Sequence, residues 1–188
     1  MTILNQINLL TWHPVRRWSV RDLTSINRII IHQELGEANV EAVNRYHLKP
    51  NHISKRGCPH FCYHYGIEKN GEIIQVNELY HITWHTTGQN DTGIGIMLVG
   101  DFAGPGHETG TSEPSPEQMN SLGELCDYLM NVDPAVDTLH VETLHVETLH
   151  ARSQQQFSNQ DIYGHYHFGK RACPGYVVQN WIENKRKN

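Results

Sequence analysis

The sequence predicts a single domain that combines buried β-strands with amphipathic helices. Three observations carry this prediction: a β-branched run at residues 29–31, an Asn-Gly pair at residues 70–71 between two strand-like runs, and a helix-start pattern at residues 115–118. A chain of 188 residues is long enough to form one domain with a sizeable hydrophobic core.

The first predicted core strand covers residues 29–31 and is followed directly by His32. A short, continuous β-branched run is typical of a buried strand. A histidine at the end of such a strand is rigidly held and open towards a cleft, which suits a ligand. A hydrogen-bonded core histidine is the alternative. Residues 94–99 predict a second buried strand, where Gly93 and Gly95 allow close backbone approach.

Asn-Gly between two β-rich runs is the strongest short signal for a hairpin. We therefore expect strands near residues 62–69 and 72–77. Side chains alternate between the two faces of a strand. This rule places Tyr63 and Tyr65 on one face, and Cys62 and His64 on the other.

Three helices are expected. The first covers residues 37–48 and ends before Pro50. The second begins with Ser115 as N-cap, Pro116 in the first turn and Gln118 completing a capping box, and it ends by about Asn131. Its apolar stripe is Met119, Leu122, Leu125 and Leu129. The third is a short terminal helix with Val177, Val178, Trp181 and Ile182 on its apolar face.

Residues 1–27 are expected to form an N-terminal extension packed on the domain. In this extension Trp12, Trp18 and Val20 would contact the domain, while Arg16, Arg17 and Arg21 would face solvent. A five-residue unit, Leu-His-Val-Glu-Thr, occurs at residues 139–143 and again at 144–148. It can be a metal-binding histidine tract or a local duplication that lengthens a surface connection, and two units are too few for a solenoid.

Composition excludes several classes of protein. The net charge of −5 argues against an extended nucleic-acid-binding surface, and the basic residues 185–187 are expected to be a solvated tail. No apolar stretch reaches the roughly 20 residues needed to span a bilayer. The N-terminus lacks the pattern of a signal peptide, so we expect synthesis in the cytoplasm without autonomous export.

Four cysteines are few for a disulfide framework. Cys58 and Cys62 can pair, bind a metal or remain free thiols.

The stretch 164–175 holds a histidine and a cysteine eight residues apart, His165 and Cys173. In an α-helix they would lie roughly 12 Å apart along the axis, too far to share an ion. Gly169 and the proline after Cys173 favour a loop, which can bring the two side chains together. Both are good zinc ligands, and a catalytic zinc site uses three protein ligands and an open position for water. A third ligand must therefore come from elsewhere in the chain.

The ordered motifs together resemble the zinc-dependent N-acetylmuramoyl-L-alanine amidases. This is the family of phage amidase-type lysozymes and animal peptidoglycan recognition proteins. The resemblance spans roughly residues 28–183. It rests on residues 29–32, on 63–65 before the Asn-Gly hairpin, on 84–86, on 94–100, and on Gly164-His165 with Cys173-Pro174-Gly175.

The resemblance implies an α/β fold, with a central mixed β-sheet flanked by helices and a zinc cleft at one edge. Residues 28–188 would form the zinc amidase domain, with a variable insertion at 132–160. The family's ligand positions match His32, His165 and Cys173, which would hold one zinc ion. The chain would act as a monomer on peptidoglycan, without nucleic acid or a membrane anchor.

The resemblance also implies the reaction, which is hydrolysis of the amide between the lactyl group of N-acetylmuramic acid and L-alanine of the stem peptide. Tyr63 matches the tyrosine of the family's site. Arg171 stands where the family often has lysine, with Lys170 beside it. His85 and Thr86 match cleft residues expected to contact substrate, and structural support of the site is the alternative for His85. His64 is expected to be structural.

Two positions distinguish this chain from a related branch of the family. Cytosolic enzymes that recycle anhydro-muropeptides resemble this pattern but have glutamate and aspartate where this chain has Met97 and Cys173. The match is therefore to the branch of phage lysozymes and recognition proteins.

Three functions remain open. The first is a cell-wall lysin, such as an endolysin, that acts on the wall after release from the cytoplasm. The second is a module that binds peptidoglycan without cutting it. The third is a histidine-rich metal-buffering protein, which would explain the 14 histidines and the five-residue unit but not the ordered motifs. Because non-cleaving relatives typically lack the cysteine ligand or the tyrosine, Cys173 and Tyr63 favour catalysis.

Overall fold

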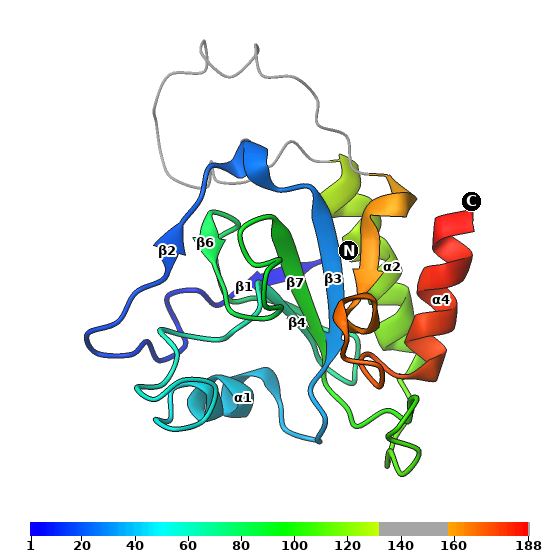
Figure 1. Cartoon of the computed structure of the whole chain (residues 1–188), viewed down its shortest axis with the longest axis horizontal. Helices are drawn as coiled ribbons and strands as arrows, with labels where there is room; N and C mark the ends of the chain where they lie inside the picture. Colours follow the sequence, from blue (N-terminus) through cyan, green and yellow to red (C-terminus); the bar gives the residue numbers. More distant parts are fainter. Residues whose placement is uncertain (132–157, 188) are drawn as a thin grey trace.

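A six-stranded mixed β-sheet forms the centre of the computed structural model, which describes residues 1–131 and 158–187 (Figure 1). The strand order is β1-β5-β4-β7-β3-β8. The strands are β1 (Ile3–Asn5), β5 (Ile73–Gln75), β4 (Tyr65–Ile67), β7 (Gly93–Leu98), β3 (Arg28–Gln33) and β8 (Ile162–Gly164). Helices cover both faces of the sheet, so the expected α/β architecture is confirmed.

The central strand β3 pairs in parallel with β7 on one side and with β8 on the other. Its residues from Ile29 to Gln33 are all buried, as expected for a parallel strand covered on both faces. Ile29 and Ile31 belong to the core on one face. His32 follows Ile31 and therefore points to the opposite face.

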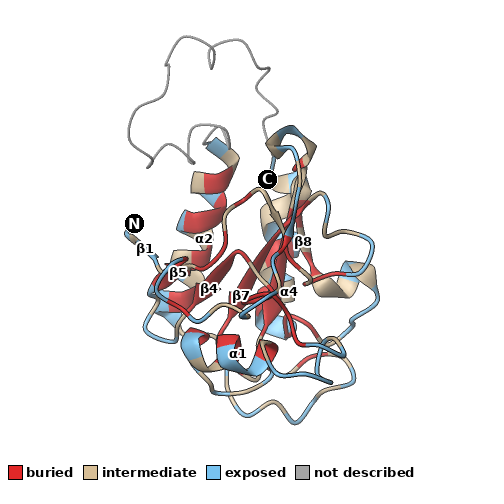
Figure 2. Ribbon diagram, turned by 90° about the vertical axis from the view of Figure 1, so that its left-hand side faces the viewer, coloured by how far each residue is buried: buried red, intermediate tan, exposed pale blue. Residues whose placement is uncertain are grey.

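Helices α2 (Pro116–Asn131) and α4 (Tyr176–Lys187) cover the face of the sheet that carries Ile29 and Ile31. The predicted capping box of α2 is present: Gln118 N donates to Ser115 Oγ at 3.0 Å, and Ser115 N donates to Gln118 Oε1 at 3.0 Å. The predicted stripe also holds, with Leu122, Leu125 and Leu129 buried and Met119 packed against the same core. Figure 2 shows the buried side of α2 turned towards the strands. In α4 Val178 and Ile182 are buried, but Val177 is 41% exposed, so its predicted place on the apolar face is wrong.

Helix α1 (Val40–His47) covers the other face. Val40 and Val43 pack there with the side chains of Phe61, Ile74, Val76 and Met97. The helix begins later than predicted, because the side chain of Asn39 caps it and accepts a hydrogen bond from Ala42 N at 2.9 Å. Two short 3-10 helices also precede core strands: η1 (Leu23–Ser25) before β3 and η3 (Asn159–Asp161) before β8.

The predicted hairpin is present as the antiparallel pair β4 and β5, although each strand is only three residues long. Tyr63 lies before β4, and the prediction that it shares a face with Tyr65 is wrong. Tyr65 belongs to the core under α2, whereas Tyr63 packs against the cluster under α1. The physical reason is irregular pairing at His64, whose carbonyl accepts from both Val76 N (2.9 Å) and Asn77 N (3.3 Å). Such irregularity interrupts the alternation of side chains.

The N-terminal residues contribute to two sheets. β1 pairs in parallel with β5, and β2 (Ser19–Val20) pairs with β6 (His81–Ile82). Trp18 is buried as expected, but Val20 is 66% exposed. The prediction that Arg21 faces solvent is wrong. Its guanidinium donates to the carbonyls of Leu79 (2.8 Å), Asn90 (2.9 Å) and Gly93 (2.8 Å), which satisfies a half-buried cation. Burial lowers the pKa of Arg21 to about 10.

The Leu-His-Val-Glu-Thr repeat lies outside the described residues, as does most of the predicted insertion at 132–160. None of the described helices is long and apolar enough to cross a membrane.

Two glycine substitutions test the packing with opposite expected signs. A Cβ added at Gly66 would lie 2.4 Å from Val40 Cγ2, so Gly66→Ala should lower the free energy of unfolding by about 1–3 kcal/mol. A Cβ at Gly123 in α2 would have its nearest neighbour, Trp181, at 3.9 Å. Gly123→Ala should therefore raise the free energy of unfolding by about 0.5–1 kcal/mol.

Denaturant titration measures the free energy of unfolding of both variants. Equal stability of Gly66→Ala and the unmodified chain would contradict the close packing of α1 on β4.

Candidate metal centre

Two of the predicted ligands meet because β3 and β8 are parallel neighbours in a fixed register. Ile31 pairs with Gly164, so His32 and His165 are the next residues along the two strands. Their ring centroids lie 4.5 Å apart. The site therefore forms where parallel strands end, the usual place for ligand sites in α/β sheets.

Cys173 reaches the same point by a tight reversal of the chain. After β8 comes a single 3-10 turn, η4 (His165–Phe168), and Gly169 then adopts a left-handed conformation with φ of 93°. The chain returns so that Tyr166 N donates to Cys173 O at 2.9 Å, and Gln33 N donates to Cys173 Sγ at 3.4 Å. The predicted loop between the histidine and the cysteine is thus one helical turn followed by a reversal.

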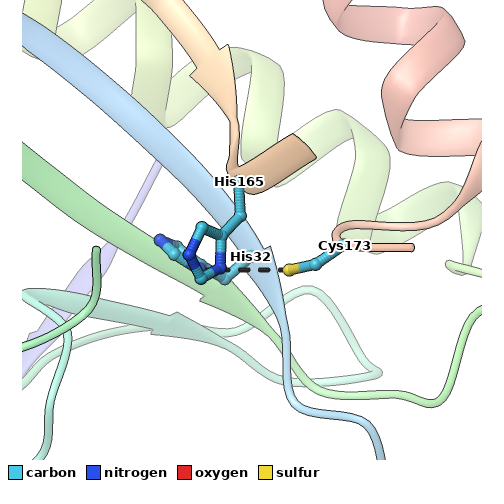
Figure 3. A group of neighbouring side chains, drawn as sticks. All are labelled: His32, His165 and Cys173. Atoms are coloured by element: carbon cyan, nitrogen blue, oxygen red, sulfur yellow. Dashed lines mark hydrogen bonds between the residues drawn. The ribbon is translucent and has the colours of Figure 1, made fainter. Parts of the chain in front are cut away.

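The side chains of His32, His165 and Cys173 point towards one another (Figure 3). One ligand atom from each lies within 4.8 Å of the other two, and His32 Nδ1 is 3.9 Å from Cys173 Sγ. Two imidazoles and one thiol at this spacing suit a tetrahedral zinc ion with one position left for water. The residues present therefore fit the ion that the resemblance implies.

The protonation states of the two histidines suit metal binding. Burial, with smaller contributions from His165 and His85, lowers the pKa of His32 well below its ordinary value. Burial and the charge of Lys170 lower the pKa of His165 to about 4. Both rings are therefore neutral at pH 7, with a lone pair available. Burial raises the pKa of the Cys173 thiol to about 12, so this thiol must release its proton when a metal binds.

His85 and Thr86 lie against the outer nitrogen of His32. His32 Nε2 is 3.2 Å from His85 Nδ1 and 3.3 Å from Thr86 Oγ1. Both residues are buried. A partner on the outer nitrogen fixes the orientation of an imidazole ligand. Here it leaves Nδ1 of His32 facing Cys173.

The ring of His85 lies over the glycines of β7. A Cβ at Gly95 would come within 2.8 Å of this ring, and one at Gly93 within 3.2 Å. The predicted backbone approach is therefore found at Gly93, where Gln89 O would lie 3.0 Å from the added Cβ, whereas the close neighbour of Gly95 is the side chain of His85. The expected structural role of His64 also agrees with its contacts: its Nδ1 accepts from Gly95 N at 3.0 Å, and its Nε2 is 3.1 Å from the Arg21 guanidinium.

Tyr63 lies beside the centre, with its ring centroid 4.9 Å from that of His32. The side chain is half-buried. Burial, followed by the negative charge that Cys173 can carry, raises the pKa of the Tyr63 phenol well above its ordinary value. The hydroxyl therefore keeps its proton at neutral pH and is available as a hydrogen-bond donor.

The two candidate cations differ in what they influence. Lys170 lies between the ligands along the chain: Lys170 N donates to His165 O, and Cys173 N donates to Lys170 O. Burial lowers the pKa of His165 and the charge of Lys170 adds to this shift, whereas at Cys173 the same charge opposes the larger rise in pKa caused by burial. Both side chains are exposed, and the charge of Arg171 contributes instead, after the backbone hydrogen bond from Gly106, to the lowered pKa of Glu108. The charge of Lys170 therefore acts on two of the ligands, and the catalytic role expected for Arg171 stays a prediction.

Two supporting residues were missed by the sequence reasoning. The side chain of Gln33 donates to Ala172 O at 3.0 Å and accepts from Phe102 N, which ties the cysteine loop to β3. Asn90 Oδ1 accepts from His85 N (3.1 Å) and Thr86 N (2.8 Å). The available signals were weak: a polar residue directly after His32, and an asparagine in a predicted turn.

The sequence pattern of the N-acetylmuramoyl-L-alanine amidase family matches residues 22–176. The chain belongs to this family. The match includes the two histidines and the cysteine of the centre, together with Tyr63, His85 and Thr86. No curated protein matches the chain at a significant level.

Solved structures share the amidase fold over nearly the whole chain. The amidase LysC from Clostridium intestinale is 21% identical, with a TM-score of 0.65, and the match covers 100% of this chain and 98% of that one. The Ph2119 endolysin from a Thermus scotoductus bacteriophage is also 21% identical, with a TM-score of 0.65 and coverage of 98% and 99%. Drosophila peptidoglycan recognition protein SD is 17% identical, with a TM-score of 0.66 and coverage of 95% and 93%.

Buried histidines outside the ligand group make the stability of this amidase-family domain depend on pH. Burial lowers the pKa of His47 to about 3 and that of His60 to about 4. Below about pH 6.5 these histidines become protonated in the unfolded chain but stay neutral in the folded protein. The free energy of unfolding therefore decreases as pH falls. Each ring should cost about 2 kcal/mol between pH 7 and pH 5. Denaturant titration at both pH values, with a chelator present, measures the loss. In the variant His60→Gln the loss of stability between the two pH values should be smaller by the contribution of that one ring. Equal stability of the unmodified protein at both pH values would contradict the burial of neutral rings.

Proposed function

We propose that this member of the N-acetylmuramoyl-L-alanine amidase family is a zinc-dependent peptidoglycan hydrolase. It would cut the amide between the lactyl group of N-acetylmuramic acid and L-alanine of the stem peptide. The observation that carries the proposal is the convergence of His32, His165 and Cys173 within 4.8 Å, next to the phenol of Tyr63. Family membership supports the reaction, and the donor set supports the metal.

His32, His165 and Cys173 would hold one zinc ion. When bound, zinc lowers the pKa of a water molecule and polarises the substrate carbonyl. The protein positions the ligands beforehand. Thr86 and His85 hold the outer nitrogen of His32, and Gln33 N donates to the sulfur of Cys173. In this proposal His85 and Thr86 act as supports of the metal ligand, because both are buried against it.

Tyr63 would serve as a hydrogen-bond donor. Its phenol keeps its proton, so it can orient the attacking water or donate to the oxygen of the amide as negative charge develops there. A cation near the same oxygen would add electrostatic stabilisation. Arg171 holds the family's position for that cation, and Lys170 is a second candidate because its charge contributes to the pKa shifts of His165 and Cys173.

Similar structures support peptidoglycan as the target. LysC is named as an amidase and the Ph2119 protein as an endolysin. Peptidoglycan recognition protein LE, 16% identical with a TM-score of 0.66, was solved in complex with tracheal cytotoxin, a monomeric diaminopimelic acid-type peptidoglycan. The proposed role is that of a lysin that is made in the cytoplasm and acts on the cell wall, as a monomer, after release. The second candidate is a recognition module that binds the same polymer without cutting it.

Digestion of purified peptidoglycan sacculi, with and without a zinc chelator, tests the function. New L-alanine amino termini and new reducing sugar ends are followed separately. Chelator-sensitive alanine termini without reducing ends are the expected result. If the zinc-loaded protein retains sacculi but releases no alanine termini, the recognition module becomes the favoured function in place of the enzyme.

Removal of the cysteine ligand should remove the metal. Cys173→Ala should lower zinc affinity by at least about 100-fold, because even supporting residues around a ligand contribute about 10- to 100-fold. Cleavage should fall to background. Cys126→Ala is the matched control, since Cys126 is also buried but lies in α2, outside the ligand group. Zinc content after dialysis and release of alanine termini are the two measurements. Full activity of a zinc-free Cys173→Ala protein would refute the metal mechanism.

Tyr63→Phe should separate zinc binding from catalysis. The ring stays in place and the ligands are untouched, so zinc affinity should be unchanged. Loss of one donor to a developing oxyanion typically costs about 10²- to 10³-fold in turnover. Zinc titration and single-substrate kinetics on a muramoyl-peptide check the two expectations. Unchanged turnover in Tyr63→Phe would show that the phenol has no role in the reaction.

The two neighbouring cations can be compared directly. Lys170→Gln should slow turnover by at least about tenfold, which corresponds to about 1.4 kcal/mol of transition-state stabilisation. Arg171→Gln should have a smaller effect, because Lys170, and not Arg171, is among the charges that shift the pKa values of His165 and Cys173. The same kinetics measure both variants. The opposite ranking would assign the cation to Arg171, at the family's position.

A further inference from the structure

Cys58 and Cys62 form a pair of thiols that the proposed reaction does not use. The Cys62 thiol donates to Cys58 Sγ at a distance of 3.0 Å. This separation is only about 1 Å longer than a disulfide bond. The two side chains are 0% and 1% exposed and pack with Trp18. Both are free thiols in the structure.

The backbone holds the two cysteines in place through a single residue of α1. Cys58 N donates to His47 O at 2.9 Å, and Cys62 N donates to His47 Nδ1 at 3.1 Å. Between them, Pro59 O accepts from His13 N at 2.8 Å. Because both ends of the segment are anchored, the sulfurs can meet through small side-chain movements without rebuilding the loop.

The surroundings make the two thiols unequal. The hydrogen bond from Cys62 and the nearby Arg16 guanidinium lower the pKa of Cys58. Burial raises the pKa of Cys62. Arg16 is fixed beside the pair because it donates to Ser54 Oγ at 2.9 Å and to Gly57 O. Cys58 is therefore the sulfur that becomes a thiolate, and thiolates are the form that reacts.

We propose that Cys58 and Cys62 are a redox-active pair that closes to a disulfide when the protein meets hydrogen peroxide. The Cys58 thiolate attacks one peroxide oxygen, the O–O bond breaks, and Cys58 becomes a sulfenic acid while hydroxide leaves. The sulfur of Cys62 then attacks the sulfenic sulfur and displaces its oxygen as water. In total, two thiols and one peroxide give one disulfide and two waters. A small oxidant suits a pair that is buried from bulkier disulfide reagents.

The disulfide would close the segment directly before Tyr63. Asn77 Nδ2 already donates to the carbonyls on either side of Cys62, to Phe61 O at 2.7 Å and to Tyr63 O at 2.6 Å. Oxidation would add a covalent link to these hydrogen bonds and fix the segment that presents Tyr63 to His32. A link across so short a loop should raise the melting temperature by about 4–8 °C.

Tryptic peptide mapping tests the pair, because cleavage after Arg56 and Lys69 releases a peptide, 57–69, that contains both cysteines. Cys126 and Cys173 fall in the separate peptides 70–152 and 172–185. The full chain, loaded with zinc, is treated with hydrogen peroxide, unfolded, alkylated with iodoacetamide and digested. We expect peptide 57–69 without alkyl groups and lighter by two hydrogen atoms, restored to two alkylated cysteines by dithiothreitol. The melting temperature should rise on oxidation and return on reduction.

Cys58→Ser and Cys62→Ser are the paired controls, and either one suffices if the other fails to fold. Neither variant should show a change in melting temperature on oxidation. Two alkylated cysteines in peptide 57–69 after peroxide treatment would overturn the proposal. So would sulfinic acid on Cys58 in place of the disulfide, or an equal rise in melting temperature in Cys58→Ser.

Discussion

The parallel pairing of β3 with β8 is the constraint on which the centre depends. With Ile31 opposite Gly164, His32 and His165 leave adjacent strands side by side and on the same face of the sheet. A slip of one residue would turn one imidazole to the opposite face, where α2 and α4 pack. The isoleucines of β3, buried under those helices, therefore determine where the ligands lie. The hydrophobic pattern of β3 thus fixes the strand register, and the register fixes the position of the metal ligands.

The face that carries His32 is built from small residues wherever another group must come close. Gly66 lets α1 rest directly on β4, and Gly95 leaves space for the ring of His85. Asn90 then holds the backbone of His85 and Thr86 from the far side. The orientation of a single imidazole thus depends on glycines in a strand, a hydroxyl in a loop and an amide in a turn. These residues lie far from His32 in the sequence, and none of them is a ligand.

Much of the fold follows from local signals, and the departures have identifiable causes. The capping box at Ser115, the Asn-Gly turn and the β-branched runs are local, and each is found where it was predicted. The face of Tyr63 was predicted wrongly, because alternation fails where the carbonyl of His64 accepts two hydrogen bonds. The burial of Arg21 was missed because its carbonyl acceptors come from residues 79, 90 and 93, which the sequence does not show to be neighbours. Likewise, the choice between Lys170 and Arg171 depends on which way a reversed loop turns its side chains.

The pairing of β1 with β5 has a practical consequence for anyone who shortens this chain. The family pattern begins at residue 22, yet β1 covers one side of β5, and Arg21 links loops around β7. A version trimmed to the family pattern would leave the backbone N–H and C=O groups on the β1 side of β5 without partners, while the side paired with β4 would be unchanged. An open strand of this kind is a template for pairing with other molecules. Trimming would therefore favour self-association and precipitation, even though every proposed ligand and Tyr63 would still be present.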